Sequence, residues 1–207
     1  MSGAGPSWGA LLGGALAAVG ASAAVAVARA MPRSNPDPRR HRPGAVFVYR
    51  NLHTGTWSVR ALEGERRGRV IAHPDAVTVE GAELRVNAAG RERVRAECVK
   101  GVHAGVVGVV APGGIPASWP RELVAEVGYN PFLFDSFVLL ANNAPLERAA
   151  YVELPPQPRG GARPLLAALL PRDRWLLELP KSPVDPARLD AMRRCRERLA
   201  ARKGQGR

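Results

Sequence analysis

The sequence predicts an α+β fold that is mostly β, with short antiparallel strands and hairpins packed against one helix. Three observations support this fold class. Between residues 45 and 154, apolar and polar residues alternate in short runs separated by Gly, Asn and Pro, which is typical of half-buried strands. Nine of the eleven aromatic residues lie between Phe47 and Tyr151, so a substantial core can form only there. One longer run, residues 88–99, has helical spacing and follows Asn87, a residue type that caps helices well.

The first predicted element is a hairpin whose arms are residues 46–51 and 56–62. On the second arm, the two-residue period of a strand places Trp57 and Val59 on one face. The polar stretch "LHTG" forms the turn between the arms. We interpret His53 as part of this turn, with its imidazole bonded to a nearby carbonyl group.

Further strands are predicted in "GRVIAH" and "AVTVEGAELRV", with Glu80 and Gly81 as a tight turn inside the second stretch. In the helix after these strands, Val94 and Cys98 lie one turn apart on the buried face. The next run, "VHAGVVGVVA", is predicted as a buried strand whose glycines allow neighbouring backbone to come close.

Three more strands are predicted after the interrupting segment "APGGIPASWP", at residues 123–128, 134–140 and 149–154. "YNP" forms the corner between the first two strands, and "NNAP" forms the turn after the second. Beyond Pro155, prolines cut the chain into short apolar pieces, so residues 155–184 are predicted to be a linker.

A basic amphipathic helix is predicted at residues 185–207. Its narrow apolar stripe consists of Leu189, Met192, Cys195 and Leu199. A helix of this kind can lie on a membrane surface, on RNA or in the groove of a partner, or it can be a soluble tail. The sequence leaves these alternatives open.

Residues 1–31 are a hydrophobic segment, and a Pro- and Arg-rich linker at residues 32–44 separates it from the domain at residues 45–154. The segment contains an uncharged run of 21 residues, long enough to span a bilayer as a helix, and arginines follow it. One interpretation is a single-pass anchor that leaves the C-terminal bulk in the cytoplasm. The alternatives are a cleaved signal or transit segment, or a misassigned start, with Met31 beginning a cytoplasmic protein.

The net charge of +12 comes wholly from the two flanks. Residues 45–154 carry twelve basic and twelve acidic residues, whereas residues 1–44 carry five and one, and residues 155–207 carry thirteen and five. Basic flanks can hold a protein near nucleic acid, an anionic membrane surface or a larger assembly without specifying the target. The candidate contacts to nucleic acid or other anions are Arg91, Arg95, Lys100, Arg193, Arg194 and Arg198.

Three histidines are candidate metal ligands or catalytic groups: His53, His73 and His103, each next to a predicted strand. Converging imidazoles could bind zinc and leave one position open for water. However, spacings of 20 and 30 residues match no ligand signature, and hydrogen bonds that hold turns are the competing interpretation. Cys98 could act as a nucleophile beside His103, but its place on the apolar side of a helix indicates an inert thiol. No cofactor is predicted, because no phosphate-binding loop or dinucleotide motif is present.

Seven stretches in the middle of the chain carry a resemblance to a known family. In order, they are "FVYRNLH", "SVR", "GRVIAH", "AGRERV", "VHAGVVG", "GYNPFLFDSFV" and "AAYVEL". Over residues 46–154 the chain resembles an uncharacterised family of small proteins from tailed phages and prophages. Gly101 departs from the pattern, in which Asn precedes the Val-His pair. The resemblance implies a phage-derived gene and a small, mostly β domain, and it brings no activity or catalytic residue with it.

The sequence therefore favours a non-enzymatic binding or structural module of phage type, with flanks that would tether it to a membrane or a larger assembly. Two alternatives stay open. One is a histidine-based, metal-dependent hydrolase or nuclease, and the other is a nonspecific nucleic-acid-binding protein that acts through its basic flanks.

Overall fold

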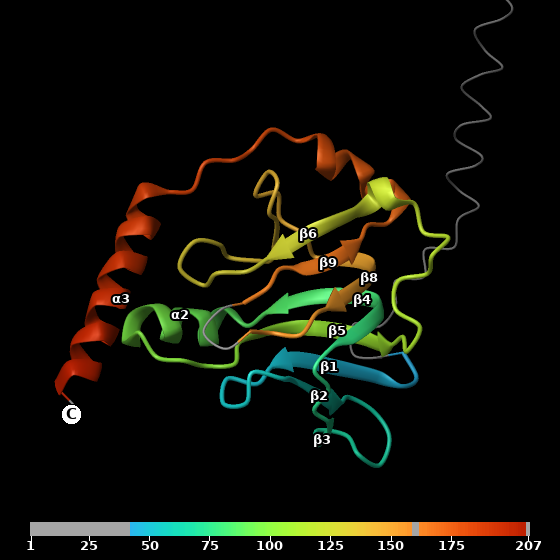
Figure 1. Ribbon diagram of the computed structural model, residues 1–207, viewed down its shortest axis with the longest axis horizontal. Coiled ribbons are helices and arrows are strands. Elements are labelled where there is room, and N and C mark those ends of the chain that lie inside the picture. Colours follow the sequence, from blue (N-terminus) through green and yellow to red (C-terminus); the bar gives the residue numbers. More distant parts are fainter. Residues whose placement is uncertain (1–41, 159–161, 206–207) are drawn as a thin grey trace, which may run out of the picture. The chain divides into compact units, whose positions relative to one another are not determined.

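The computed structural model describes residues 42–158 and 162–205, all within the unit of the chain formed by His41–Arg207. The described part contains a nine-stranded sheet in the order β3-β2-β1-β5-β4-β8-β9-β6-β7, with every neighbouring pair antiparallel (Figure 1). The strands are β1 (Ala45–Arg50), β2 (Trp57–Ala61), β3 (Val70–Ala72), β4 (Val77–Val86), β5 (Ala104–Val110), β6 (Val124–Gly128), β7 (Val138–Leu139), β8 (Arg148–Leu154) and β9 (Leu165–Ala168). The helices are α2 (Ala88–Glu97) and α3 (Pro186–Gln205), with two 3-10 helices, η1 (Arg121–Leu123) and η2 (Pro171–Glu178). The predicted fold class, α+β and mostly β, is confirmed.

The first predicted hairpin is present as β1 and β2, which pair from Val46↔Ala61 to Arg50↔Trp57. Asn51 closes its turn, because its side-chain oxygen accepts hydrogen bonds from the backbone N–H groups of His53 and Thr54, at 2.9 and 3.2 Å. The turn is therefore held by an asparagine that imitates a backbone acceptor.

The tight turn predicted at Glu80 and Gly81 is wrong, because β4 runs through these residues as one strand of ten. Its register with β5 shifts between Glu80 and Glu83, which is a β-bulge, and Gly81 has a φ of 57°. The extra residue lets Val79 and Ala82 both face the core, at 0% and 1% exposure.

A row of core side chains crosses four neighbouring strands of the sheet. Val59 lies opposite Val48, Val48 opposite Val106, and Val106 opposite Leu84. All four are buried, and residues directly opposite in an antiparallel pair point to the same face. The core therefore lies on this face of the sheet.

The glycines of β5 allow the close approach that the sequence predicts. A Cβ atom at Gly105 would lie 2.5 Å from the carbonyl oxygen of Val48 and 2.6 Å from the Phe47 ring. A Cβ atom at Gly108 would lie 2.5 Å from the carbonyl oxygen of Glu80. Both positions leave no room for a side chain.

The predicted strand at residues 134–140 is shorter than expected, because only Val138 and Leu139 pair as β7. The residues before them form a loop organised by Asn130. Its side-chain oxygen accepts from the N–H of Phe132 at 2.9 Å, and its carbonyl accepts from the N–H groups of Leu133 and Phe134. Local hydrogen bonding of this kind competes with strand pairing.

The linker predicted at residues 155–184 instead contains β9 and η2. β9 pairs with β8 on one side and β6 on the other, and Ala167, Ala168 and Leu169 have 0% exposure. A four-residue apolar strand between prolines shows no alternation, which is why the sequence pattern does not reveal it. This segment contributes to the core.

Both predicted helices are present. Asn87 caps α2 by accepting from the N–H of Gly90 at 3.0 Å, and Val94 and Cys98 are buried as expected. Within the stripe predicted on α3, Cys195 is 4% exposed, whereas Leu189 and Leu199 are each 38% exposed. Figure 1 shows α3 beside α2 at one end of the sheet.

None of the helices in the described ranges is both long enough and apolar enough to span a membrane. The hydrophobic segment predicted at residues 1–31 lies outside the described residues.

Replacing Gly105 with Ala should lower the free energy of unfolding by roughly 1–3 kcal/mol, because the added methyl group overlaps backbone and ring atoms. Urea unfolding followed by circular dichroism measures this change. Gly113→Ala is the matched control, since nothing lies within 4 Å of its Cβ position. Equal stability of the two variants would contradict the close packing of β1 on β5.

Candidate functional site

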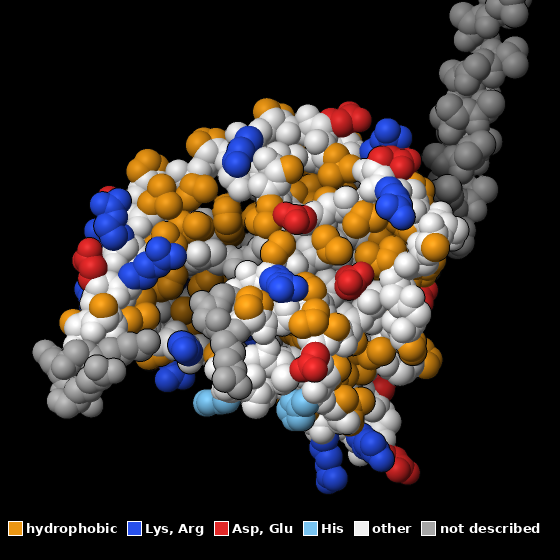
Figure 2. Space-filling model, in the orientation of Figure 1, with side chains coloured by type: hydrophobic (Ala, Val, Ile, Leu, Met, Phe, Trp, Pro, Cys, Tyr) orange, Lys and Arg blue, Asp and Glu red, His pale blue; other side chains and the backbone are white. Residues whose placement is uncertain are grey.

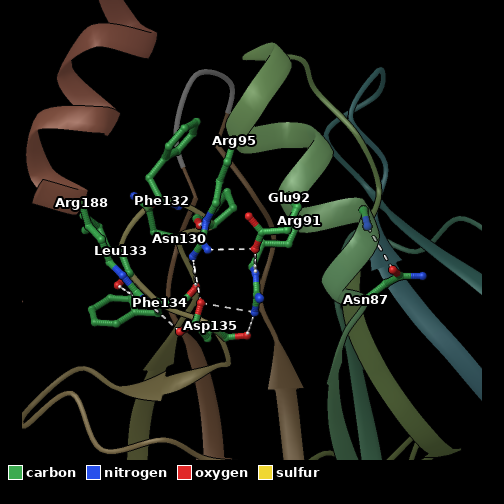
Figure 3. Close-up of polar contacts among 12 residues, drawn as sticks. Asn87, Arg91, Glu92, Arg95, Asn130, Phe132, Leu133, Phe134, Asp135 and Arg188 are labelled. Carbon is green, nitrogen blue, oxygen red and sulfur yellow. Dashed lines mark hydrogen bonds and ion pairs between the residues drawn. The ribbon is translucent and has the colours of Figure 1, made fainter. Parts of the chain in front are cut away.

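The loop of residues 129–137, which joins β6 to β7, is held by arginines from two helices (Figure 3). Arg95 of α2 donates hydrogen bonds to the carbonyl oxygens of Pro131 and Phe134, the latter at 3.2 Å. Arg91, one turn earlier, donates to the carbonyl of Asp135 at 2.7 Å. Arg188 of α3 donates to the carbonyl of Leu133 at 3.0 Å. Three guanidinium groups thus bind main-chain acceptors that the loop cannot pair by itself.

The carboxylate of Asp135 lies at the centre of these arginines. Its oxygens lie 2.7 Å from Arg188, 3.0 Å from Arg95 and 3.4 Å from Arg91. Glu92 adds a second carboxylate, 3.0 Å from both Arg91 and Arg95. The hydrogen bond from Arg188 is the main reason why the pKa of Asp135 lies below its usual value. We call these five residues the arginine clamp.

The cationic residues that the sequence suggests as anion contacts lie at different places in the structure and do not form one site. Arg91 and Arg95 belong to the arginine clamp, where they join α2 to the loop. Lys100 is exposed after α2. On α3, Arg193 pairs with Asp190 at 3.0 Å, and Arg194 and Arg198 are exposed.

The three candidate histidines do not converge on a metal site. His53 is exposed in its turn, whereas His73 places Nδ1 3.2 Å from the Ser58 hydroxyl. His103 places Nδ1 2.7 Å from the carbonyl oxygen of Gly101. Among the described residues, which include all three histidines, no three His, Cys, Asp or Glu side chains are placed to hold a metal ion.

Cys98 meets Cys195 rather than a catalytic partner. The two thiols interact with each other, and both are free and buried. Burial is the larger cause and the interaction with the Cys98 thiol the smaller cause that raise the pKa of Cys195 to about 11. A thiol in this state is protonated at neutral pH and poorly nucleophilic. The contact joins the end of α2 to α3.

An apolar cavity of about 430 Å³ lies between the core face of the sheet and the clamped loop. Residues of the strands β1, β2, β5, β6, β8 and β9 line it, together with the loop and the segment before β9. The apolar side chains that line it include Val48, Trp57, Val106, Val127, Phe134, Phe137, Leu140 and Leu165. In Figure 2, hydrophobic side chains gather on the face that lies between α3 and the strands.

Polar groups at the cavity are few and mostly satisfied. Trp57 donates from Nε1 to the carbonyl of Pro155 at 2.9 Å, and Gln157 accepts from the N–H of Arg163 at 2.9 Å. The Tyr129 hydroxyl is buried with no hydrogen-bond partner among the described residues. Burial raises the pKa of Tyr129 to about 12, so the phenol stays neutral. Such a cavity can enclose an apolar group and exclude water from it.

Sequence reasoning missed the cavity and the clamp. The signal present in the sequence is the stretch "GYNPFLFDSFV", which supplies the loop, together with arginines one helical turn apart at 91 and 95. The contribution of Arg188 has no local signal, because 53 residues separate it from Asp135.

Comparison with known proteins gives one family. The family model described as "Mycobacterium phage L5 gene 82 protein" matches residues 39–159. The gene 82 protein of Mycobacterium phage L5 is 39% identical to this chain over 120 residues, which cover 55% of this chain and 91% of that protein. No solved structure matches. The matched residues include β1 to β8, α2 and the clamped loop, and they end before β9.

Asp135→Asn should lower the free energy of unfolding by about 1 kcal/mol, since the amide keeps the shape but leaves three guanidinium groups with less neutralising charge. Asp190→Asn, which affects one exposed pair with Arg193, is the control.

The stabilisation by Asp135 should depend on pH. Because folding lowers the pKa of Asp135, its contribution to the free energy of unfolding is present above the usual aspartate pKa and is lost as the pH falls through the lowered value. Urea unfolding at neutral and acid pH measures both effects. If the difference in free energy of unfolding between the wild type and Asp135→Asn were the same at acid pH as at neutral pH, this role of Asp135 would be contradicted.

Oxidised glutathione should link Cys98 to Cys195. The two thiols give up two protons and two electrons, and the oxidant is reduced to two molecules of glutathione. The reaction should be faster at pH 9 than at pH 7, because the raised pKa of Cys195 limits the thiolate. Peptide mapping without reductant detects the link, and Cys195→Ser is the control. Mixed disulfides with glutathione, without the internal link, would show that α3 does not lie against α2.

Proposed function

The chain belongs to the family of the Mycobacterium phage L5 gene 82 protein, and we propose that it is a non-enzymatic binding module of phage type. We propose further that its ligand is a small amphipathic molecule. The observation that carries this proposal is the apolar cavity between the sheet and the clamped loop.

The size and lining of the cavity support a small-molecule ligand. Ligand sites usually measure about 300–1,000 Å³ and are mainly apolar with a few polar groups. At about 430 Å³ the cavity lies within that range, and aromatic and aliphatic side chains form most of its surface. Transfer of the ligand's apolar body from water into this space would supply the main driving force.

The polar groups of the cavity suggest where the charged end of the ligand would lie. Arg163 belongs to the lining and is exposed to solvent. The amphipathic ligand would therefore carry an anionic group near Arg163, with its apolar body against Trp57 and Phe137.

The arginine clamp supports the proposal of a binding site, because it holds one side of the cavity in place. It positions the loop through main-chain carbonyls, so the wall formed by Leu133 and Phe134 is held before a ligand arrives. A site held in this way loses less conformational entropy on binding. The basic flanks would tether the module to a membrane or a larger assembly.

The expected outcome is that the folded protein binds one equivalent of 1-anilinonaphthalene-8-sulfonate, an aromatic anion of the proposed chemistry, with enhanced fluorescence. Ala104→Leu should weaken this binding at least about tenfold, because Ala104 lines the cavity and the larger side chain fills it. Ala150→Leu is the matched control, since Ala150 is also half-buried in a strand but does not line the cavity.

A further variant tests the charged end of the ligand. Arg163→Gln should weaken the sulfonate probe about fivefold, and the difference should shrink at high salt. Thermal unfolding shows whether each variant remains folded. Equal binding by the Ala104→Leu and Ala150→Leu variants, or no binding by the folded wild type, would contradict the proposed site.

A further inference from the structure

A second pocket lies on the face of the sheet opposite the core. Phe47 and Tyr49 alternate with the core residues Val46 and Val48 along β1, so their rings point away from the core. Arg60 lies directly opposite Phe47 on β2 and therefore shares this face. The pocket measures about 580 Å³. It shares no lining residue with the apolar cavity, so this inference does not rest on the proposed function, although His103 of this pocket packs edge-on against Tyr129 of the cavity.

The floor of this pocket is an aromatic platform. The rings of Phe47 and Tyr49 are stacked, with centroids 5.5 Å apart and an interplanar angle of 28°. Gly105 makes this arrangement possible, because a Cβ atom there would lie 2.6 Å from the Phe47 ring. Both rings are half-buried, so each keeps an accessible part. Partly exposed aromatic rings on a strand can stack on planar ligands.

Arg60 supplies a cation beside the platform. Its guanidinium carbon lies 5.2 Å from the centroid of the Phe47 ring. Its Nε atom is buried and has no hydrogen-bond partner among the described residues. A buried donor without an acceptor is costly, and an anionic oxygen would satisfy it. Arg85 also lines the pocket and pairs with Glu83 at 2.8 Å.

His103 adds an acceptor to the same pocket. Its Nδ1 atom lies 2.7 Å from the carbonyl oxygen of Gly101, which can only accept, so Nδ1 carries the proton. In the neutral imidazole, Nε2 is then an acceptor, and it is buried without a partner among the described residues. The pocket therefore offers a stacking surface, an unsatisfied guanidinium donor and an unsatisfied imidazole nitrogen.

We propose that this pocket binds a nucleotide, with the base stacked on the ring of Tyr49 or Phe47 and the phosphate paired with Arg60. His103 accepts a hydrogen bond from an N–H group of the base. The same chemistry is present in a free mononucleotide and in one unit of a single-stranded nucleic acid. The site lies inside the neutral middle of the chain and does not depend on the basic flanks.

The test uses the full-length protein with two probes, a fluorescently labelled single-stranded oligothymidylate and free thymidine monophosphate. Fluorescence anisotropy measures the affinity for the oligonucleotide, and the mononucleotide is added as competitor. Tyr49→Leu and Arg60→Gln should each weaken the bound probe by about five- to a hundredfold. Tyr49→Phe keeps the stacking ring and should keep most of the affinity.

Arg121→Gln is the matched control for charge, because Arg121 is exposed outside the pocket and its loss lowers the net charge by the same amount. This variant should bind within about twofold of wild type. Full competition by the mononucleotide identifies a free nucleotide as the ligand, whereas binding of the oligonucleotide alone identifies single-stranded nucleic acid. Either result supports the site if the Arg60 and Tyr49 variants, shown to be folded by circular dichroism, lose affinity.

Two outcomes would overturn the proposal. One is oligonucleotide binding that Arg60→Gln weakens no more than Arg121→Gln does and that Tyr49→Leu leaves unchanged, which would assign binding to overall charge and the flanks. The other is no binding of either probe by the folded wild-type protein.

Discussion

The hydrogen bonding of β9 between β8 and β6 is the interaction on which the rest of the structure depends. β6 has β9 and β7 as its neighbours, so within residues 42–158 and 162–205 only β9 joins β6 and β7 to the other strands of the sheet. β6 and β7 carry the loop that walls the apolar cavity. A strand of four residues from a Pro-rich segment thus holds in place half of the candidate binding site. Its buried residues, Leu165, Ala167 and Ala168, are small or flexible enough to pack without the strict alternation of an ordinary strand.

Charge has two different roles in this protein. The net charge of +12 arises from residues 1–44 and 155–207, and an excess of this kind attracts anions at long range without selectivity. In the arginine clamp, by contrast, Arg91, Arg95 and Arg188 are used locally, and each binds both a carboxylate and a main-chain carbonyl. This arrangement connects α2, the loop and α3. The C-terminal helix is therefore joined to the fold by ionic contacts and by the meeting of Cys98 with Cys195.

The two faces of the sheet have distinct chemistry because strand residues alternate. One face carries the row from Val59 to Leu84 and continues into the apolar cavity. The other carries Phe47, Tyr49 and Arg60, with polar atoms that lack partners among the described residues. Gly105 makes room on this second face, because the absence of a side chain there leaves space for the Phe47 ring. A single bulge in β4 keeps both faces in register past Gly81.

Features that depend on neighbours in the chain could be predicted from the sequence alone. These include the mostly β class, the hairpin of β1 and β2, the Asn87 cap of α2, the burial of Val94 and Cys98, and the phage family. Periodicity and capping are local, so a single sequence contains enough information for them. The tertiary structure alone decided that Glu80 and Gly81 form a bulge, that β9 enters the sheet, and that Asp135 meets arginines from two helices. Each of these depends on a partner strand or side chain far along the chain, and the free energy of such a contact has no signature in the residues on either side of it.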